Sequence, residues 1–279
     1  MRELNDIQKI EQNITKKFHK ELWSKFQIAI HRYQLIEKGD RIAACISGGK
    51  DSMLMAFMLR MYQKYRMEDF ELVYLVMDPG YNPLNRRRIE ENAEKLGLPI
   101  TVFSTRIFDI ANHTGKSPCY LCARMRRGAL YNKAQELGCN KIALGHHLND
   151  AIETPLMSMF YSSKIETIIP KSHSENYAGM ELIRPMYCIK EEDIIRWCDM
   201  NDLHFIRCAC RLTEALEEEN SGISSKRKEI KDLIAELKKD NPGIEDNIFS
   251  ALHAVQLDTF PGYKRNGVVH NFLDEYDEN

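Results

Sequence analysis

A glycine-rich hexapeptide, Ser47-Gly48-Gly49-Lys50-Asp51-Ser52, separates a short apolar run over residues 41–46 from a helical pattern over residues 51–65. At a junction between a strand and a helix, several backbone N–H groups point outward at the positive end of the helix dipole, so the junction favours an anion. Glycines leave room for a phosphate group to approach the backbone. The segment therefore predicts a phosphate-binding loop, and the alternative is a tight turn with an ordinary helix cap.

The side chains of the hexapeptide suit the same chemistry. Ser47 and Ser52 add hydroxyl donors. Lys50 can neutralise a leaving pyrophosphate, and Asp51 offers the hard oxygen ligand that Mg²⁺ prefers. The residue order is neither G-x-x-x-x-G-K-[ST] nor G-x-G-x-x-G, so the loop is not a Walker A loop or a dinucleotide fingerprint. The coincidence of a glycine pair, a lysine and an aspartate favours a nucleotide site over the plain turn.

A second polar motif, Gly145-His146-His147-Leu148-Asn149-Asp150, follows a predicted strand over residues 141–144. In a doubly wound sheet, the loops at the carboxyl ends of neighbouring strands share one crevice. We expect this strand to lie beside the strand over residues 41–46, so that the second motif faces the glycine-rich loop. Taken alone, two adjacent histidines are more often core or surface residues, but their place in this loop favours a role in the site.

Eight cysteines provide a third kind of chemistry. Cys119 and Cys122 open a predicted helix over residues 119–137, where the helix N-terminus and the nearby arginines 124, 126 and 127 favour thiolates. Cys208 and Cys210 lie far downstream. Judged by spacing, this set fits a structural zinc site first, with a redox disulfide or an iron–sulfur site as alternatives. The other four are expected to be buried apolar residues: Cys45, Cys139, Cys188 and Cys198.

Alternating strand and helix patterns must position these residues, and they predict an α/β fold with a doubly wound, mostly parallel sheet. We divide the chain into an N-terminal helical segment (1–38), an α/β domain (39–210) and a helical C-terminal extension with an acidic tail (211–279), in which no strong strand is visible. Strands are expected over residues 41–46, 72–77, 100–104, 141–144 and 182–184, and helices over 51–65, 85–96, 119–137, 150–161, 191–200, 224–239 and 244–254.

The composition restricts the class of protein. The 279 residues have a net charge of −2, no apolar run of about 18 residues that could span a membrane, and no signal-peptide pattern at the start, so we expect a cytoplasmic protein. A near-neutral chain is not a bulk electrostatic binder of nucleic acid. Local basic surfaces are still present: the first 38 residues have eight Lys/Arg against five Asp/Glu, and basic runs occur at 86–88, 124–127 and 226–228.

The motifs taken in order carry a family resemblance. SGGKDS, PCYLCARMRRG (118–128), KIALGHHLNDAIET (141–154), IRPM (183–186) and IRCAC (206–210) resemble the tRNA 2-thiocytidine biosynthesis proteins of TtcA type, members of the PP-loop ATP pyrophosphatase superfamily. The resemblance covers nearly the whole chain, including the segment around residues 247–255. Where the family pattern has an aspartate, this chain has Asn149, which leaves Asp150 as the better candidate for Mg²⁺.

The resemblance implies an ATP-dependent tRNA sulfurtransferase. The expected cofactors are ATP, Mg²⁺ and a [4Fe–4S] cluster held by Cys119, Cys122 and Cys208, with Cys210 as the alternative third ligand. The nucleotide would contact the SGGKDS loop together with Gly145, His146, Asp150 and Arg184, although a structural ion pair is an equal alternative for Arg184.

The implied product is 2-thiocytidine at tRNA position 32, formed by adenylating C2 of the cytidine and replacing its oxygen with sulfur. The implied partners are tRNA and a sulfur donor such as a cysteine desulfurase, with no membrane, and a homodimer is compatible with the resemblance. Two alternatives stay open: the same fold thiolating another tRNA base, which gives 2-thiouridine, and a zinc- or cluster-binding RNA-binding or redox protein without ATP chemistry. The intact Lys50, Asp51 and Ser52 weigh against the latter.

Overall fold

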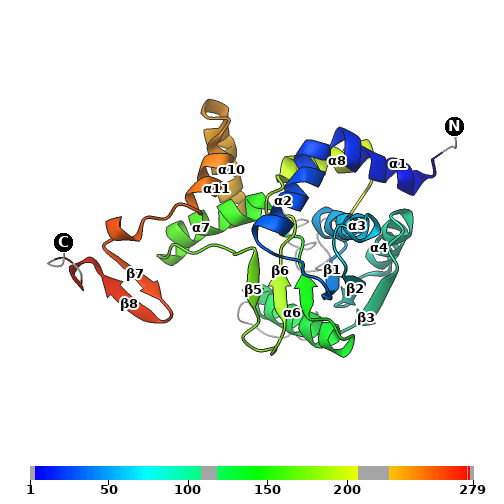
Figure 1. Ribbon diagram of the computed structural model, residues 1–279, viewed down its shortest axis with the longest axis horizontal. Coiled ribbons are helices and arrows are strands. Elements are labelled where there is room, and N and C mark those ends of the chain that lie inside the picture. Colours follow the sequence, from blue (N-terminus) through cyan, green and yellow to red (C-terminus); the bar gives the residue numbers. More distant parts are fainter. Residues whose placement is uncertain (1–3, 108–117, 207–225, 275, 277–279) are drawn as a thin grey trace.

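The computed structural model describes residues 4–107, 118–206, 226–274 and 276. A six-stranded sheet with the strand order β3-β2-β1-β4-β6-β5 forms its centre (Figure 1). The strands are β1 (Arg41–Ile46), β2 (Glu71–Asp78), β3 (Ile100–Ser104), β4 (Lys141–Ala143), β5 (Lys171–His173) and β6 (Glu181–Ile183). All neighbouring strands pair in parallel except β5, which runs antiparallel to β6 at the edge. The predicted α/β fold is confirmed.

The two strands that precede the polar motifs lie side by side. Ala43 of β1 is in register with Ile142 of β4 and, on the other side, with Val73 of β2. Five of the six β1 residues are buried, which is why this strand reads as a continuous apolar run rather than an alternating one. The loops that leave the carboxyl ends of β1 and β4 are therefore neighbours, as expected for a crevice in a doubly wound sheet.

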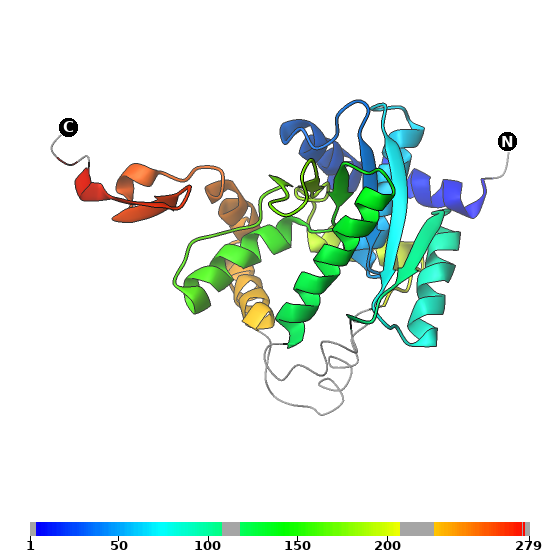
Figure 2. The same ribbon diagram turned by 90° about the horizontal axis from the view of Figure 1, so that it is seen from below.

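Helices cover both faces of the sheet (Figure 2). On one face, α6 (Pro118–Glu136) packs through Tyr131 and Ala134 on Ala43, Cys45 and Ile142. On the other face, three helices share the larger core with Ile42, Ala44 and Ile46: α3 (Lys50–Lys64), α4 (Pro83–Lys95) and α8 (Glu191–Met200). Successive residues of β1 thus point alternately into the two cores, and this packing on both faces fixes the position of the carboxyl end of the strand.

The N-terminal segment is helical and packs its apolar side on this larger core. It consists of α1 (Asp6–Gln12), two π-helical stretches η1 (Asn13–Lys17) and η2 (His19–Trp23), and α2 (Ser24–Arg32). The buried residues recur every four positions: Ile14, Phe18, Leu22, Phe26 and Ile30. On a helix of 3.6 residues per turn, a strict four-residue repeat drifts by about 40° per step. The wider π turns offset that drift and keep the stripe facing the core.

The C-terminal extension packs on α7 (Leu148–Ser162), the helix that follows the second polar motif. Its helices α10 (Lys226–Asp240) and α11 (Ile244–Ala251) form a small core with α7 in which Leu148, Ile152, Ile230 and Ile234 are buried. Beyond the short turn η3 (Leu257–Thr259), the chain runs into a part that projects from the body in Figure 1.

That projecting part corrects one expectation. No strand was predicted after residue 211, yet β7 (Gly262–Arg265) and β8 (Val268–Asn271) form an antiparallel hairpin, followed by the turn η4 (Phe272–Asp274). Its turn residues, Asn266 and Gly267, both have positive φ, as a two-residue hairpin turn requires. The Asn-Gly pair was the missed sequence signal. In the described ranges, no helix is both long and apolar enough to cross a membrane.

Candidate nucleotide-binding site

The loop between β1 and α3 has the geometry of a phosphate cradle. Gly48 has φ +88°, and a Cβ there would lie 2.6 Å from Cγ1 of Ile89 and 2.7 Å from Cδ1 of Ile206, so only glycine fits. The backbone N–H of Ser47 donates to Oγ of Ser52 at 3.1 Å, and that hydroxyl donates to the Gly49 carbonyl at 2.9 Å. The two serines, predicted as ligand donors, thus also hold the loop in shape.

The second polar motif touches this loop directly. A Cβ on Gly145 would lie 2.9 Å from the carbonyl carbon of Asp51 and 2.9 Å from the backbone nitrogen of Ser52. A side chain at this position would therefore push the two loops apart. The prediction that the loops after β1 and β4 face each other is confirmed, and Gly145 contributes to the site by being small.

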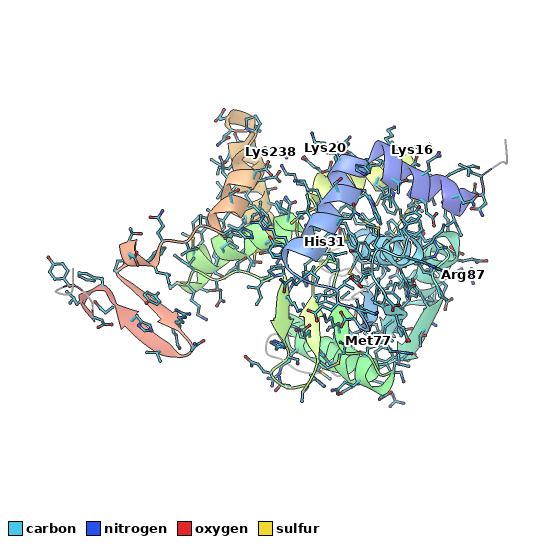
Figure 3. All side chains as sticks on the ribbon, viewed as in Figure 1. Lys16, Lys20, His31, Met77, Arg87 and Lys238 are labelled. Carbon is cyan, nitrogen blue, oxygen red and sulfur yellow. The ribbon has the colours of Figure 1, made fainter. Side chains whose placement is uncertain are left out.

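A cavity of about 410 Å³ opens between the two loops and α6. Its volume falls in the range of small-molecule sites. The polar part of its wall combines the two loops with two arginines of α6: Ser47, Asp51, Ser52, His146, Asp150, Arg126 and Arg127. The apolar part includes Cys45, Met77 (labelled in Figure 3) and Leu130. A planar apolar group and an anion can therefore be held side by side.

Several buried polar atoms in the cavity wall or in the residues next to it lack a hydrogen-bond partner within the described part of the chain. They are Oδ1 of Asp51, Nδ1 of His146, Nδ1 of His147, Oε2 of Glu153 and Nε of Arg184. Oδ1 of Asp51 lies 3.1 Å from Nζ of Lys50, within ion-pair distance but without hydrogen-bond geometry. Buried polar groups are rarely left unsatisfied in proteins. Two of these residues, Asp51 and His146, line the cavity itself, so a polar ligand bound there would satisfy their free atoms.

Lys50 is held by a carboxylate that the sequence did not single out. Glu191, the first residue of α8, accepts hydrogen bonds from Nζ of Lys50 at 2.8 Å and from Nζ of Lys231 of α10 at 2.7 Å. Burial would raise the pKa of Glu191, but these two hydrogen bonds outweigh it and lower that pKa to about 2. Glu191 is therefore ionised at any physiological pH and fixes the position of the loop lysine.

Asn149 has a structural place rather than a place in the cavity wall. Its side-chain carbonyl accepts from the backbone N–H of Glu191 at 2.9 Å, and its amide donates to Glu245 of α11 at 2.7 Å. An asparagine can make both bonds because it carries an acceptor and a donor, whereas an aspartate would place a second carboxylate against Glu245. An asparagine at this position, where the family pattern has an aspartate, therefore links α7, α8 and α11 through two hydrogen bonds.

Asp150 and Glu153 of α7 receive positive charge from the C-terminal extension. Oδ2 of Asp150 accepts from the backbone N–H of His147 at 3.1 Å, and its Oδ1 accepts from the Arg227 guanidinium. The same guanidinium lies 3.4 Å from Oε2 of Glu153, and Nζ of Lys231 lies 3.9 Å from Oε1 of Glu153. Burial nevertheless raises the pKa of Glu153 to about 7. The arginine of the local basic run at 226–228 thus pairs with Asp150, which lines the cavity, and with Glu153.

His146 and Arg184 are largely buried polar side chains without a carboxylate at ion-pair distance in the described part of the chain. Burial lowers the pKa of His146 to about 4, so its imidazole is neutral near pH 7. Arg184 is buried, donates to the Ile169 carbonyl, and has no carboxylate within ion-pair distance among the described side chains. Burial and the neighbouring Arg127 lower the pKa of Arg184 to about 10. An unpaired buried guanidinium is costly unless an anion joins it.

Most of the predicted nucleotide residues converge. Ser47, Asp51, Ser52, Gly145, His146 and Asp150 line the cavity, and Gly48 and Gly49 shape its rim. Lys50 and Arg184 are not among the described residues that line the cavity, and they donate hydrogen bonds to Glu191 and to the Ile169 carbonyl, respectively. The sequence did not single out Glu191, Lys231 or Arg227 for the site, and its only local signal for Glu191 was a helix start after β6.

The predicted cluster ligands are only partly placed. Cys119 and Cys122 belong to the first turn of α6, three residues apart, while Cys208 and Cys210 lie outside the described residues. Cys45, Cys139, Cys188 and Cys198 are buried free thiols, as expected. Cys45 also lines the cavity, where burial raises its pKa to about 12, so it is a thiol and not a thiolate.

Comparison with known proteins identifies the family of this chain. The family described as "PP-loop domain" matches residues 10–214, which include the whole sheet and both loops. The chain belongs to the PP-loop family. Two curated PP-loop relatives bear the name tRNA-cytidine(32) 2-sulfurtransferase. One, from Polaromonas naphthalenivorans, is 34% identical over 92% of this chain and 78% of its own length, and one from Geobacter metallireducens is 34% identical over 82% of this chain and 87% of its own length.

A solved structure shares the fold of this PP-loop chain. It is that of the U34-tRNA thiolase NcsA from Methanococcus maripaludis with its [4Fe–4S] cluster. The two align with a TM-score of 0.65 over 87% of this chain and 80% of the other, at 20% identity. At that identity the similarity concerns the fold, which is the α/β architecture described above.

Proposed function

We propose that this PP-loop protein is an ATP-dependent tRNA-cytidine(32) 2-sulfurtransferase. The observation that carries the proposal is the cavity between the β1–α3 and β4–α7 loops, whose wall combines a glycine cradle, two carboxylates and two arginines and includes the unsatisfied Oδ1 of Asp51 and Nδ1 of His146. The relatives of that name, at 34% identity over most of this chain, supply the substrate and the product. The IRPM and IRCAC segments and the paired cysteines at 119 and 122, which resemble those of the same family, support the proposal.

The volume of the cavity and the two arginines in its wall support ATP as the ligand. Its triphosphate would lie on the Ser47–Ser52 loop at the N-terminus of α3, where backbone N–H groups and the helix dipole favour an anion. The adenine would contact the apolar wall near Met77 and Leu130. Lys50, held by Glu191, would face the leaving pyrophosphate.

Mg²⁺ fits the carboxylates at the cavity. Oδ1 of Asp51 is buried without a hydrogen-bond partner, and Asp150 lines the same cavity. No group of three or more His, Cys, Asp or Glu side chains able to hold a metal occurs among the residues that the structure describes. A magnesium ion bound by Asp51 and Asp150 would therefore take its other ligands from ATP phosphates and water, as Mg²⁺ commonly does.

The reaction follows from positioning and charge. The O2 atom of the cytidine attacks the α-phosphorus of ATP, the bond from that phosphorus to the β-phosphate oxygen breaks, and pyrophosphate leaves with its charge neutralised. Sulfur at the oxidation level of sulfide then bonds to C2, the C2–O bond breaks, and AMP leaves. No electrons are gained or lost overall. The chain contributes by orienting the groups and by stabilising charge on the phosphates.

The iron–sulfur cluster and the sulfur donor belong to the same proposal. The ligands would be Cys119 and Cys122 of the first α6 turn and Cys208, with Cys210 as the alternative. A cluster bound there would supply the sulfur atom. The cavity wall includes Arg126 and Arg127 of the same helix, which supports a short path between the sulfur source and the adenylated base.

A reconstituted assay tests the proposal. The full chain, purified anaerobically, is mixed with ATP, Mg²⁺, sulfide and transcribed tRNA that carries cytidine or uridine at position 32. We expect pyrophosphate release and 2-thiocytidine with the cytidine transcript alone. Equal pyrophosphate release with both transcripts would contradict the assigned substrate. Colourless protein with one zinc and no iron would contradict the cluster and leave the assignment of ATP and tRNA to be judged by the pyrophosphate result.

A further inference from the structure

The N-terminal helices carry a concentrated positive charge on their outer side. Between residues 16 and 32 the chain has five lysines and arginines and one acidic residue. We call Lys16, Lys17, Lys20, Lys25 and Arg32 the N-terminal basic stripe. All five are exposed, and Lys16 and Lys20 project outward from the helices in Figure 3. The whole molecule is slightly acidic, so this charge is local.

The side chains of the stripe are free of ion pairs with the described residues, in contrast to most of the lysines of the α/β domain. Lys50, Lys64, Lys133, Lys141, Lys171 and Lys190 each lie within 4 Å of a carboxylate. The one acidic residue within the stripe's span, Glu21, is half-buried and forms no ion pair with the described residues. Arg32 lies 5.6 Å from the ring of Tyr33. Unpaired positive charges held this close repel one another, and an anionic partner would remove that cost.

The stripe is held rigidly. The opposite side of the same helices is the buried row that includes Phe18, Leu22 and Phe26, each at most 1% exposed. Residues 16–32 span roughly 25 Å at helical rise. A fixed row of positive charges of this length suits a partner with regularly spaced negative charges.

We propose that the N-terminal basic stripe binds the phosphodiester backbone of the tRNA substrate, outside the catalytic cavity. This inference rests on the proposed function for the identity of the RNA. A membrane surface fits less well, because a helix that lies in a membrane needs an available apolar face, and here that face is in the core. An acidic protein surface fits less well, because it carries its negative charges at irregular positions, whereas a nucleic-acid backbone repeats one negative charge per nucleotide.

The test compares two full-length triple variants with equal loss of charge. The first, Lys16→Gln, Lys17→Gln and Lys20→Gln, removes three charges from the stripe. The control, Lys133→Gln, Lys171→Gln and Lys239→Gln, removes three charges that are already paired with carboxylates. The dissociation constant for a transcribed tRNA with cytidine at position 32 is measured over a range of KCl concentrations, and thermal unfolding confirms that both variants are folded.

We expect the stripe variant to bind roughly 10- to 100-fold more weakly near 0.15 M salt, with the slope of log K against log[salt] reduced by about 2 to 3, since each neutralised phosphate contributes close to one to that slope. The control variant should stay within about 3-fold of wild type. At saturating tRNA, both should thiolate at the wild-type rate.

Equal losses of tRNA affinity in the two variants would overturn the inference, and so would wild-type tRNA binding by the stripe variant. The inference also fails if the stripe variant changes only binding to anionic vesicles or to an acidic protein. If the wild-type chain forms 2-thiocytidine and the stripe variant binds tRNA normally, the inference fails while the proposed function stands. If the wild-type chain neither binds tRNA nor forms 2-thiocytidine, the proposed function fails, and the inference fails with it.

Discussion

The N-terminal stripe and α10 are both basic helical regions, yet the structure uses their charges in opposite ways. The lysines of the stripe face solvent. Three basic residues of α10 instead contact acidic residues of the α/β domain and α11: Arg227 contacts Asp150 and Glu153, Lys231 contacts Glu191, and Lys238 contacts Glu192 and Glu245. A run of basic residues in a sequence therefore does not say whether its charges are available to a partner, because that depends on what the fold places opposite.

This difference suggests a division of work. The paired charges of α10 adjust the electrostatics of the cavity and connect the C-terminal extension to it, whereas the unpaired stripe can contribute to the affinity for RNA. Variants on the α10 side should change the catalytic rate or the stability and leave tRNA affinity unchanged. Variants of the stripe should do the reverse.

The largest expected effect concerns the carboxylate between Lys50 and Lys231. In Glu191→Gln, the side chain keeps its shape and loses its charge, so Lys50 loses its shortest ion pair and keeps, among the described residues, only the contact with Asp51. We expect kcat for pyrophosphate release to fall roughly 100-fold, the usual cost of misplacing a catalytic group by about 1 Å, with the Kd for tRNA unchanged. The matched control is Glu192→Gln, which removes a more exposed carboxylate paired with Lys238. Equal rates for the two variants would show that Glu191 has no role in positioning Lys50.

A smaller effect is expected in the stability of the joint between α10 and α7. Arg227→Gln leaves the largely buried carboxylates of Asp150 and Glu153 with less compensation. Because Arg227 is itself 43% exposed, solvent screens part of this loss, and we expect about 1–2 kcal/mol, or a Tm lower by roughly 2–6 °C. The neighbouring Lys228→Gln, at an exposed pair with Asp232, should cost less than about 0.5 kcal/mol. Identical melting temperatures would mean that α10 is not anchored through Arg227.

The smallest effect is a pH dependence at Glu153. Its pKa is about 7 in the folded chain and 4.5 in its ordinary environment, so folding takes up a proton between these values, and stability falls as the pH rises through about 7. From pH 6 to 8, the wild type should lose about 1 kcal/mol of unfolding free energy relative to Glu153→Gln, which cannot titrate. Denaturant unfolding at both pH values measures this difference. A constant difference, or one of opposite sign, would mean that Arg227 and Lys231 keep Glu153 ionised.

Much of the nucleotide site could be predicted because its determinants are local. The apolar run of β1, the glycine pair and the following helix are contiguous, and the adjacency of β4 follows from the rules of doubly wound sheets. Gly145 belongs to the same class, since it lies directly after a strand at the carboxyl edge of the sheet.

The residues that sequence reasoning missed depend on contacts between distant parts of the chain. Lys231 is 40 positions from Glu191, and Arg227 is 77 from Asp150, so their pairing exists only once α10 has packed on α7. Strand β5, with the sequence Lys-Ser-His, is too short and polar to show a strand pattern, and β6 provides its hydrogen bonds. The hairpin of β7 and β8 is a different case, because its signal is local. Its strands show only weak apolar alternation, but the Asn-Gly pair between them is typical of a two-residue hairpin turn.

The central claim, that this chain thiolates cytidine 32 of tRNA with ATP bound at the glycine-rich loop, is tested most directly by nucleoside mass spectrometry. tRNA is isolated from a strain that lacks this chain, and from the same strain complemented with the wild type or with Lys50→Met. We predict that 2-thiocytidine is absent from the deletion strain, returns with the wild type and stays absent with Lys50→Met. Unchanged 2-thiocytidine in the deletion strain would contradict the assigned product, and full restoration by Lys50→Met would contradict the role of the loop.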